Sequence, residues 1–534
     1  HFKADETATE VVGRVAAEWP PDVLLCGCPE VLPPPREVER CPIKTVALLS
    51  DWNLYQPQLE HNLARFDIVL SDRLAERELC VWGARPHFVQ PLYAHRTLVH
   101  RPLEIDRDID VLFLGNLNHA IHRERGRMLE IAARLSDEYR VLIDAGYPPE
   151  DYARHLNRAR IVVNHAVRRE MNLRCFEAPV CGALLFFEDA NLEAGDYLAD
   201  GEQAVRYNAG NLEGLLRTYL DDEEKRAAVA RAGRERIAGL AIERRLDDLF
   251  DWMEVQPRGA RRFLELPEAV RALADVMLYA SSLETEQRAL AAALLGELLG
   301  RDRTPPCLMA AGCMLFEEAA LGGSPDAAKT VRACVDRFQE AAQTAPTDAA
   351  PWFNLAVVAR QANAGIAELE CLRRVLDAHD VALSPFALGK VTDPYYAAWR
   401  LALGRGAMSP ALLQAAAAAR LAECALERGD NGDALEFARQ SIMLRPEIAV
   451  PYRWAAMAHT RAGANDEAAR LLEVGLPHTA FDVDYRLDLV SAYRALGRHD
   501  TARALAIESA RIFQACPPLR RHAIQFRSLA VEDG

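Results

Sequence analysis

The sequence lacks an excess of basic side chains, and this absence already excludes some classes of partner. Its 534 residues contain 63 Lys and Arg against 78 Asp and Glu, which gives a formal net charge of −15 at pH 7. A surface this negative repels phosphate backbones and anionic lipid over most of its area. We therefore expect neither nucleic acid nor an anionic membrane surface as the partner.

Long apolar runs and metal-binding cysteine pairs are also missing. The longest apolar runs, such as Val111–Leu114 and Ala183–Phe187, have strand length and fall far short of the ~20 residues that cross a bilayer. None of the 12 cysteines forms a C-x-x-C pair, the spacing used by many zinc sites. No basic, apolar leader opens the chain. The sequence favours reduced thiols, a cytoplasmic location, no membrane span and no metal.

The pattern of the chain changes near residue 250. Before that point short apolar runs alternate with amphipathic segments, which predicts βα units around parallel sheets. The expected strands cover residues 23–25, 45–49, 68–70, 87–90, 111–114, 141–143, 161–163 and 184–187. Later, Ala and Leu dominate at helical spacing. We predict α/β lobes over residues 1–104 and 105–256, facing each other across a cleft, and an all-α domain over 257–534.

A repeat runs through the last hundred residues. Three sets recur at an interval of 34 residues: Gly429, Gly463 and Gly497; Ala434, Ala468 and Ala502; and Leu421, Ala455 and Leu489. Glycine permits a tight turn between two helices, and the small alanine lets the second helix pack closely on the first. The period, and Pro446 at the end of one unit, resemble the tetratricopeptide repeat. Ala480 and Gln514 replace the proline in the next two units. We expect a helical solenoid.

One segment in the second lobe indicates nucleotide chemistry. After the strand 161–163 comes a polar loop, and a helix should begin near Asn172 and contain Glu177. The free N–H groups at a helix N-terminus stabilise an anion such as a diphosphate. The carboxylate of Glu177 could accept hydrogen bonds from a ribose diol. The pattern suits a nucleotide-sugar, although an amphipathic helix with solvated charges would explain it equally well.

This segment also resembles a known family. The run Asn172-x-Arg174-x-Phe176-Glu177-Ala178-x-x-x-Gly182 resembles the nucleotide-binding helix of GT-B glycosyltransferases, specifically the group-1, CgeB-like branch. Residues 198–207 and 111–116 resemble other parts of the same donor lobe. The resemblance implies a two-lobed, Rossmann-like GT-B core in front of the tetratricopeptide-type solenoid.

The resemblance also implies roles for individual residues. Glu177 would bind the ribose of the donor, and Arg174 with one of Arg123 or Arg125 would neutralise the leaving diphosphate. The other implied donor-binding residues are Gly115, Asn116, Asn172 and Phe176. Preorganised guanidinium groups stabilise a leaving group that gains negative charge, so no metal and no cofactor besides the nucleotide-sugar substrate is expected. Arg169 stands where many retaining relatives have a glutamate, so the stereochemistry stays open.

The catalytic candidates are Asp51, His119, His122 and His165. An inverting transfer needs a general base near the acceptor hydroxyl. Asp51 follows the predicted strand 45–49, and strand-end residues in such a sheet point into the crevice. We prefer Asp51 as the base, although an aspartate there could instead cap a turn. His165 would contact the sugar or orient its loop.

The concave face of such a solenoid ordinarily binds an extended peptide. The residues expected on it, Asn354, Arg420, Trp454 and Asp488, are mixed and do not form the asparagine ladder of the O-GlcNAc transferases. We predict a glycosyltransferase that moves a sugar from a nucleoside-diphosphate donor, a UDP-sugar, to a hydroxyl of a protein acceptor held by the solenoid. The alternatives are a polysaccharide or small-molecule acceptor, and an inactive scaffold.

Overall fold

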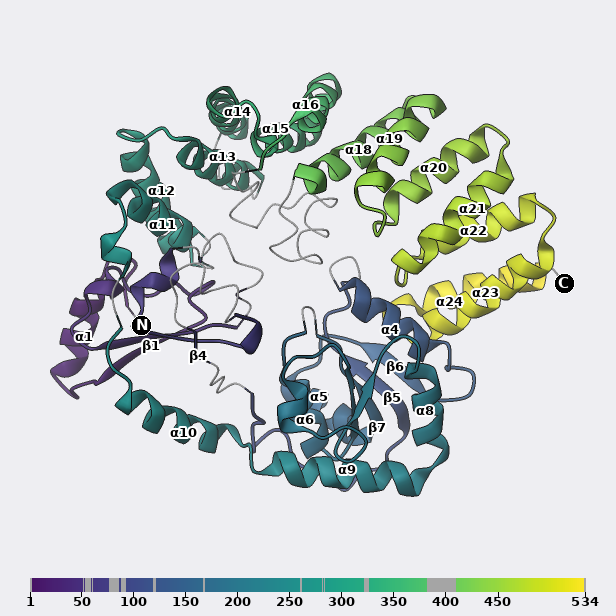
Figure 1. Ribbon diagram of the computed structural model, residues 1–534, viewed down its shortest axis with the longest axis horizontal. Coiled ribbons are helices and arrows are strands. Elements are labelled where there is room, and N and C mark those ends of the chain that lie inside the picture. The colour runs from purple at the N-terminus through teal and green to yellow at the C-terminus, as the bar shows by residue number, and fades with distance from the viewer. Residues whose placement is uncertain are drawn as a thin grey trace. The chain divides into compact units, whose positions relative to one another are not determined.

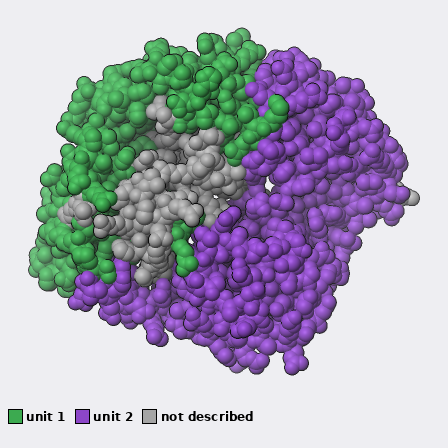
Figure 2. Space-filling view, viewed as in Figure 1, with its two compact units in different colours: residues 1–90, 256–424, 443–445 green, residues 91–255, 425–442, 446–534 purple. Residues whose placement is uncertain are grey.

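The computed structural model describes residues 2–50, 52, 59, 61–75, 86–87, 93–118, 122–166, 169–259, 262–280, 282, 284–320, 326–381 and 410–532. The chain forms two compact units (Figure 2). Unit 1 contains residues 1–90, 256–424 and 443–445, and unit 2 contains residues 91–255, 425–442 and 446–534. Each unit thus combines an α/β part with helices from the second half of the chain. The predicted domain limits at residues 104 and 256 stay predictions.

The α/β part of unit 1 is a parallel sheet of order β1-β2-β3-β4 (Figure 1). Its strands are β1 (Val23–Gly27), β2 (Lys44–Leu48), β3 (Ile68–Leu70) and β4 (Pro86–His87). The other elements of this part are α1 (Ala8–Ala16), η1 (Val38–Arg40) and η2 (Asn62–Arg65). The central strands β2 and β3 are almost entirely buried, as expected for parallel strands covered on both faces. The predicted strands 23–25, 45–49 and 68–70 are confirmed; of the predicted strand 87–90 only His87 is described, and it lies in β4, whereas residues 88–90 lie outside the described residues.

From residue 262 on, the described residues of unit 1 are mainly helical. Its elements are η4 (Arg262–Glu265), α11 (Glu268–Ala280), α12 (Thr285–Leu299), α13 (Pro305–Ala320), α14 (Ala327–Thr344), α15 (Ala349–Gln361), α16 (Gly365–Asp377) and most of α18 (Pro410–Glu427). Consecutive helices pack on one another, with α13 against α14 and α15 against α16. This confirms the expected all-helical region.

A buried arginine joins the sheet part of unit 1 to its helices. Arg65 is 2% exposed and forms ion pairs with Glu39 at 2.8 Å and Asp275 at 2.5 Å. Its Nε donates to Asn62 Oδ1 at 2.8 Å, and its guanidinium lies 3.5 Å from the centroid of the Phe263 ring. Because Glu39 precedes the sheet strand β2 and Asp275 belongs to α11, one side chain connects the two parts.

Unit 2 contains a second parallel sheet, of order β6-β5-β7-β8-β9 (Figure 1). Its strands are β5 (Ile109–Leu114), β6 (Val141–Asp144), β7 (Ala159–Val163), β8 (Leu184–Glu188) and β9 (Val205–Tyr207). The helices of this part are α4 (Arg123–Ala133), α5 (Pro149–Arg158), α6 (Arg174–Val180), α7 (Ala194–Tyr197), α8 (Leu212–Asp221), α9 (Glu223–Ala238) and α10 (Ile242–Val255). The predicted strands of the second lobe are confirmed.

The two faces of this sheet have separate cores, because successive side chains of a strand point to opposite faces. Val111 and Phe113 of β5 lie in one core with side chains of α4 and α8. Leu112 and Leu114 lie in the other with side chains of α5, α6 and α9. The fold is therefore doubly wound, with helices on both faces of the sheet.

The last repeats belong to unit 2. They consist of α19 (Asn431–Leu444), α20 (Val450–Arg461), α21 (Asn465–Gly475), η6 (Leu476–His478), α22 (Val483–Ala495), α23 (His499–Gln514), η7 (Pro517–Leu519) and α24 (Arg520–Glu532). Each glycine of the repeat, Gly429, Gly463 and Gly497, has a positive φ of 70 to 79° between two helices. The following alanines, Ala434, Ala468 and Ala502, are all fully buried. The helix-turn-helix reading of the repeat is confirmed.

These repeats pack on the second sheet. Side chains of α21 to α24 share one continuous core with β5, β6 and α4. The backbone N–H of Ile143, on the edge strand β6, donates to the carbonyl of Ala515 at 2.9 Å. An edge strand left open invites pairing with other chains, so the repeats here cover an edge as well as extend the core. No helix in the described ranges is both long and apolar enough to cross a membrane.

Two glycines of unit 2 should respond to alanine in opposite directions. A Cβ on Gly233 in α9 would lie 2.2 Å from the carbonyl oxygen of Gln203, whereas one on Gly214 in α8 would meet nothing within 4 Å. We expect Gly233→Ala to destabilise the protein by about 1–3 kcal/mol through overpacking. Gly214→Ala should stabilise it by up to about 1 kcal/mol through helix propensity. Urea unfolding measures both, and equal effects would contradict the packing described.

Candidate functional site

The candidate site lies at the carboxyl edge of the second sheet, where the connections diverge. From β5 the chain crosses to β6 on one side and then returns to β7 on the other side of β5. In open α/β sheets ligands bind in the crevice outside such a switch point. The loop after β5 starts at Gly115 and the loop after β7 starts at Asn164, so both predicted donor loops begin here.

Arg174, the first residue of α6, reaches across this switch point. Its Nη1 donates to Asn164 Oδ1 at 2.8 Å, and its Nη2 donates to the carbonyl of Leu114. The guanidinium carbon lies 4.6 Å from the centroid of the Phe113 ring. A Cβ on Gly115 would lie 2.6 Å from Nη2 of Arg174. The glycine predicted to admit a pyrophosphate thus leaves room for a guanidinium.

Arg125, in the first turn of α4, lies beside the same ring. Its Nε donates to the carbonyl of His165 at 2.8 Å, and its Nη1 donates to that of Asn116 at 3.5 Å. Its guanidinium lies 5.6 Å from the Phe113 centroid. Burial, and secondarily the positive charge of Arg174, lower the pKa of Arg125 to about 10. Two guanidinium groups of like charge thus lie beside one ring, Arg125 buried and Arg174 partly buried, an arrangement that a bound anion would stabilise.

Glu177 lies one turn into α6 and is 6% exposed. Its Oε2 accepts from the hydroxyl of Tyr152 at 3.0 Å, and its Oε1 lies 3.5 Å from His100 Nε2. Since His100 Nδ1 accepts from the backbone N–H of Arg96 at 3.4 Å, the imidazole proton is placed on Nε2, facing the carboxylate. Burial raises the pKa of Glu177 and lowers the pKa of His100 to about 4.

The remaining donor-site predictions have different surroundings. Phe176 is fully buried and packs against Tyr93 and Tyr197, so it supports α6 from the core. The helix predicted to start near Asn172 starts at Arg174, and no described residue bonds Asn172 Oδ1. Arg123 donates to the carbonyl of Glu447 at 2.6 Å, in the helical part of unit 2.

Of the catalytic candidates, the structure describes His122 and His165, whereas Asp51 and His119 lie outside the described residues. His165 Nδ1 lies 2.8 Å from the carbonyl of Ala166. Burial lowers the pKa of His165, so the ring is neutral near pH 7. The neutral ring, on the loop held by Arg125, has one unprotonated nitrogen that can accept a hydrogen bond.

Glu188 is a residue at this edge that the sequence reasoning missed. It ends β8 and is 4% exposed, and its Oε1 accepts from the backbone N–H of Ala166 and from Asn191 Nδ2, both at 3.0 Å. It thereby fixes the loop after β7. The available signal was its position, an acid directly after the apolar run Leu184–Phe187. Among the described residues no cluster of three or more His, Cys, Asp or Glu could hold a metal.

The predicted inner-face residues of the solenoid mostly have partners within the protein. Arg420 pairs with Glu368 at 2.8 Å, and Asp488 pairs with Arg453 at 2.6 Å. A separate groove of about 790 Å³ lies between α12, α13 and α14 in unit 1. Its lining is mainly small and apolar, with Ala280, Ala289, Ala292, Gly296, Ala311 and Ala333 among the residues. The groove therefore offers room for larger apolar side chains.

Glu188 should give unit 2 a measurable pH dependence. Burial raises the pKa of Glu188 to about 7, from 4.5. The folded state then binds more protons than the unfolded state between these values, so stability falls as pH rises toward 7. We expect wild-type protein to lose up to roughly 3 kcal/mol relative to Glu188→Gln between about pH 5 and pH 8. Parallel unfolding curves for both proteins across this pH range would contradict the assignment.

Comparison with known proteins finds one family match. Residues 99–251 match a family described as glycosyl transferase-like. None of the curated protein sequences compared with the chain matches it.

Several solved structures are similar to parts of the chain. MamA shares 13% identity over 43% of this chain and 92% of its own, with a TM-score of 0.26. Sucrose-phosphate synthase from Thermosynechococcus elongatus shares 12% identity over 46% of this chain and 77% of its own, with a TM-score of 0.35. HepE from Anabaena, solved in complex with UDP and glucose, shares 13% identity over 40% of this chain and 72% of its own, with a TM-score of 0.34.

The glycosyl transferase-like match falls within unit 2. It covers β5 to β9 and both arginines of the switch point. Residues 99–251 therefore form a glycosyl transferase-like domain, in agreement with the resemblance predicted from the run around Glu177.

Proposed function

We propose that the protein is a glycosyltransferase that moves a sugar from a nucleoside-diphosphate donor, a UDP-sugar, to a hydroxyl of a protein acceptor. The observation that carries the proposal is the pair of guanidinium groups of Arg125 and Arg174 beside Phe113, at the switch point of a glycosyl transferase-like domain. The cytoplasm is the location we expect for this activity.

The two arginines suit the departure of a diphosphate. As the bond between the sugar and the diphosphate breaks, negative charge accumulates on the phosphate oxygens. Guanidinium groups that are already fixed stabilise this charge without reorganising during the reaction. Arg174 and Arg125 are fixed in this sense, because backbone carbonyls and Asn164 Oδ1 hold them. We propose that phosphate oxygens accept from the N–H groups that these contacts leave free on the Nη atoms of Arg174 and Arg125.

Glu177 is the residue we propose for the ribose. Its carboxylate is oriented by the hydroxyl of Tyr152, and its oxygens have lone pairs left for further donors. The ribose hydroxyls would donate hydrogen bonds to these lone pairs of Glu177. For the acceptor hydroxyl we retain Asp51 as the proposed base, with His165 beside the sugar. The leaving diphosphate is neutralised by arginine in this scheme, so no metal is required.

The acceptor is proposed to bind the helical region. The groove between α12, α13 and α14 can receive apolar side chains of a protein acceptor, because its lining is mainly alanine, leucine and methionine. The direct test of the whole proposal is mass spectrometry of proteins co-expressed with this chain. An added hexose or N-acetylhexosamine supports it, and an unmodified proteome together with no hydrolysis of any UDP-sugar by the purified protein contradicts it.

Changes around Glu177 should weaken donor binding in a graded way. Glu177→Gln replaces one acceptor oxygen by a donor, so UDP affinity should fall about tenfold or more. Tyr152→Phe removes the hydroxyl that orients the carboxylate, and affinity should fall several-fold. The matched control is Tyr139→Phe. It removes a 2.7 Å hydrogen bond to Asp221, which involves no residue of the candidate site, and UDP affinity should not change. Calorimetry of the full chain with UDP measures all three; unchanged affinity in Glu177→Gln would disprove the ribose assignment.

The groove is tested with two neighbouring alanines of α12. Both Ala292 and Ala293 are exposed, but only Ala292 lines the groove. Ala292→Arg should fill the groove and reduce modification of the protein acceptor at least tenfold, while hydrolysis of the UDP-sugar stays at the wild-type rate. Ala293→Arg, with the same added charge and bulk, should leave both reactions unchanged. Equal modification by the two variants would place the acceptor elsewhere.

A further inference from the structure

Helix α4 links the candidate site to the C-terminal repeats. Its first turn carries Arg125, which bonds the carbonyls of His165 and Asn116 in the two loops of the switch point. Its later turns carry Glu130 and Arg134, which are four residues apart and therefore lie on one face of the helix. Both of these side chains contact the repeats of unit 2.

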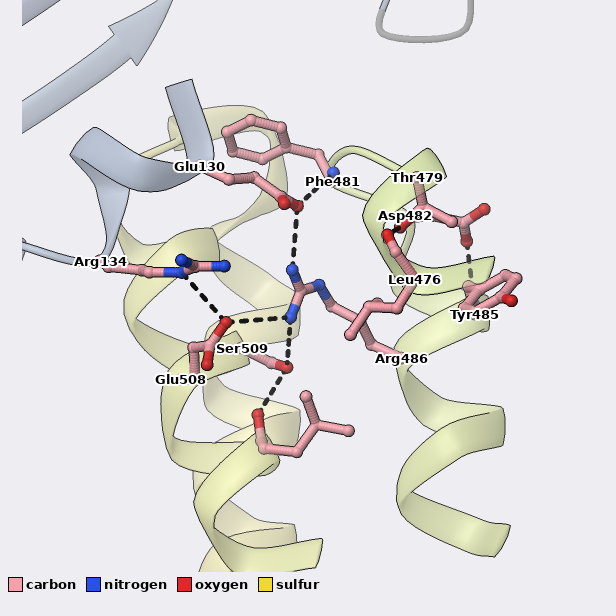
Figure 3. A network of polar contacts seen from close by, with 11 residues as sticks. Glu130, Arg134, Leu476, Thr479, Phe481, Asp482, Tyr485, Arg486, Glu508 and Ser509 are labelled. Atoms are coloured by element: carbon pink, nitrogen blue, oxygen red, sulfur yellow. Dashed lines mark hydrogen bonds and ion pairs between the residues drawn. The ribbon is translucent and has the colours of Figure 1, made fainter. Parts of the chain in front are cut away.

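The contact at Glu130 is a buried ion pair. Its Oε1 lies 3.1 Å from Nη2 of Arg486 and accepts from the backbone N–H of Phe481 at 2.6 Å (Figure 3). Arg486 also approaches Glu508 at 3.8 Å and donates to Ser509 Oγ at 3.4 Å. Arg486 is 1% exposed and Glu130 is 6% exposed. Figure 3 shows the guanidinium between the two carboxylates, with Glu130 on α4 and Glu508 on α23.

Two more contacts hold α4 to the repeats on either side of this pair. Toward the C-terminal end of the helix, Arg134 Nε lies 3.1 Å from Glu508 Oε1. At its N-terminal end, Arg123 donates to the carbonyl of Glu447 at 2.6 Å. The first turn, the third turn and the C-cap of α4 are therefore held from the same side. A helix is stiff over this length, so the repeats set the position of the turn that carries Arg125.

The burial of the pair gives this contact a defined geometry. Two buried charges stabilise each other well only when their distance and their remaining hydrogen bonds are good, and a buried pair is often no more stabilising than apolar side chains of the same size. Apolar packing of α4 on the repeats would stabilise the contact but would not fix how the two helices are aligned. The ion pair adds a fixed register between α22 and α4, because a displacement of either helix would leave a buried charge without its partner.

We propose that Arg486 is a positioning residue for the diphosphate site. Through Glu130 it holds α4 so that Arg125 reaches both loops of the switch point, and the C-terminal repeats thereby form part of the donor-binding apparatus. This inference rests on the proposed function, since Arg125 is taken to contact the diphosphate. It assigns the last repeats a role separate from that of the acceptor groove in unit 1.

The test uses a variant that removes the charges and keeps the hydrogen bond. In Glu130→Gln/Arg486→Met, the Gln oxygen still accepts from Phe481 N–H, and no buried charge of the pair remains. The expected result is a melting temperature near that of the wild type and a fall of about tenfold in affinity for UDP, measured by calorimetry on the full chain. The control is Arg65→Met, which breaks a comparable buried network in unit 1. It should lower the melting temperature and leave UDP affinity unchanged.

A double-mutant cycle with Arg125 separates positioning from a general structural effect. If Arg486 acts through Arg125, the pair substitution should cause less than a twofold further loss in an Arg125→Gln background, because coupled residues are not additive. The same tenfold loss in both backgrounds would overturn the proposal, and so would wild-type UDP affinity in Glu130→Gln/Arg486→Met. Wild-type protein that binds no UDP would instead contradict the proposed function itself.

Discussion

The candidate site depends on one interaction, the placement of the Arg174 guanidinium over the Phe113 ring at the switch point. The guanidinium joins the end of β5, through the carbonyl of Leu114, to the end of β7, through Asn164. These are the two neighbouring strands whose connections run to opposite sides, β5 to β6 and β7 to β8, so a cation bridges the starts of their loops. Arg125 adds a second positive charge from the opposite face of the sheet. Two fixed positive charges at this point would attract an anion.

A buried arginine also joins the helices to the sheet within each unit. Arg65 connects α11 to the first sheet, and Arg486 connects α22 and α23 to α4 beside the second. Removing one partner of such a pair leaves an uncompensated buried charge, which typically costs 3–5 kcal/mol. The helical region is for this reason part of each unit's core, in addition to any surface that it offers to a partner. Removing the repeats would expose the core that they share with β5, β6 and α4.

Much of this architecture was predictable because it is recorded in local patterns. The alternation of apolar runs gave the strands of both sheets, and the glycines at an interval of 34 residues gave the turns between helices. Arg174 and Glu177 could be singled out as candidates because they stand in a short, contiguous motif. Contacts between distant segments have no such signal: Arg123 bonds the carbonyl of Glu447, 324 residues away. Glu188 was missed because its partners, Ala166 and Asn191, are assembled by the pairing of β7 with β8.

The central claim is that Arg125 and Arg174 bind the diphosphate of a nucleotide donor, and a comparison of UDP with uridine tests it most directly. Calorimetry on the full chain should give UDP at least a tenfold higher affinity than uridine, since only UDP carries the charge that the two guanidinium groups attract. In Arg174→Gln this difference should shrink to less than threefold. Equal affinities of UDP and uridine for the wild-type protein would contradict the account.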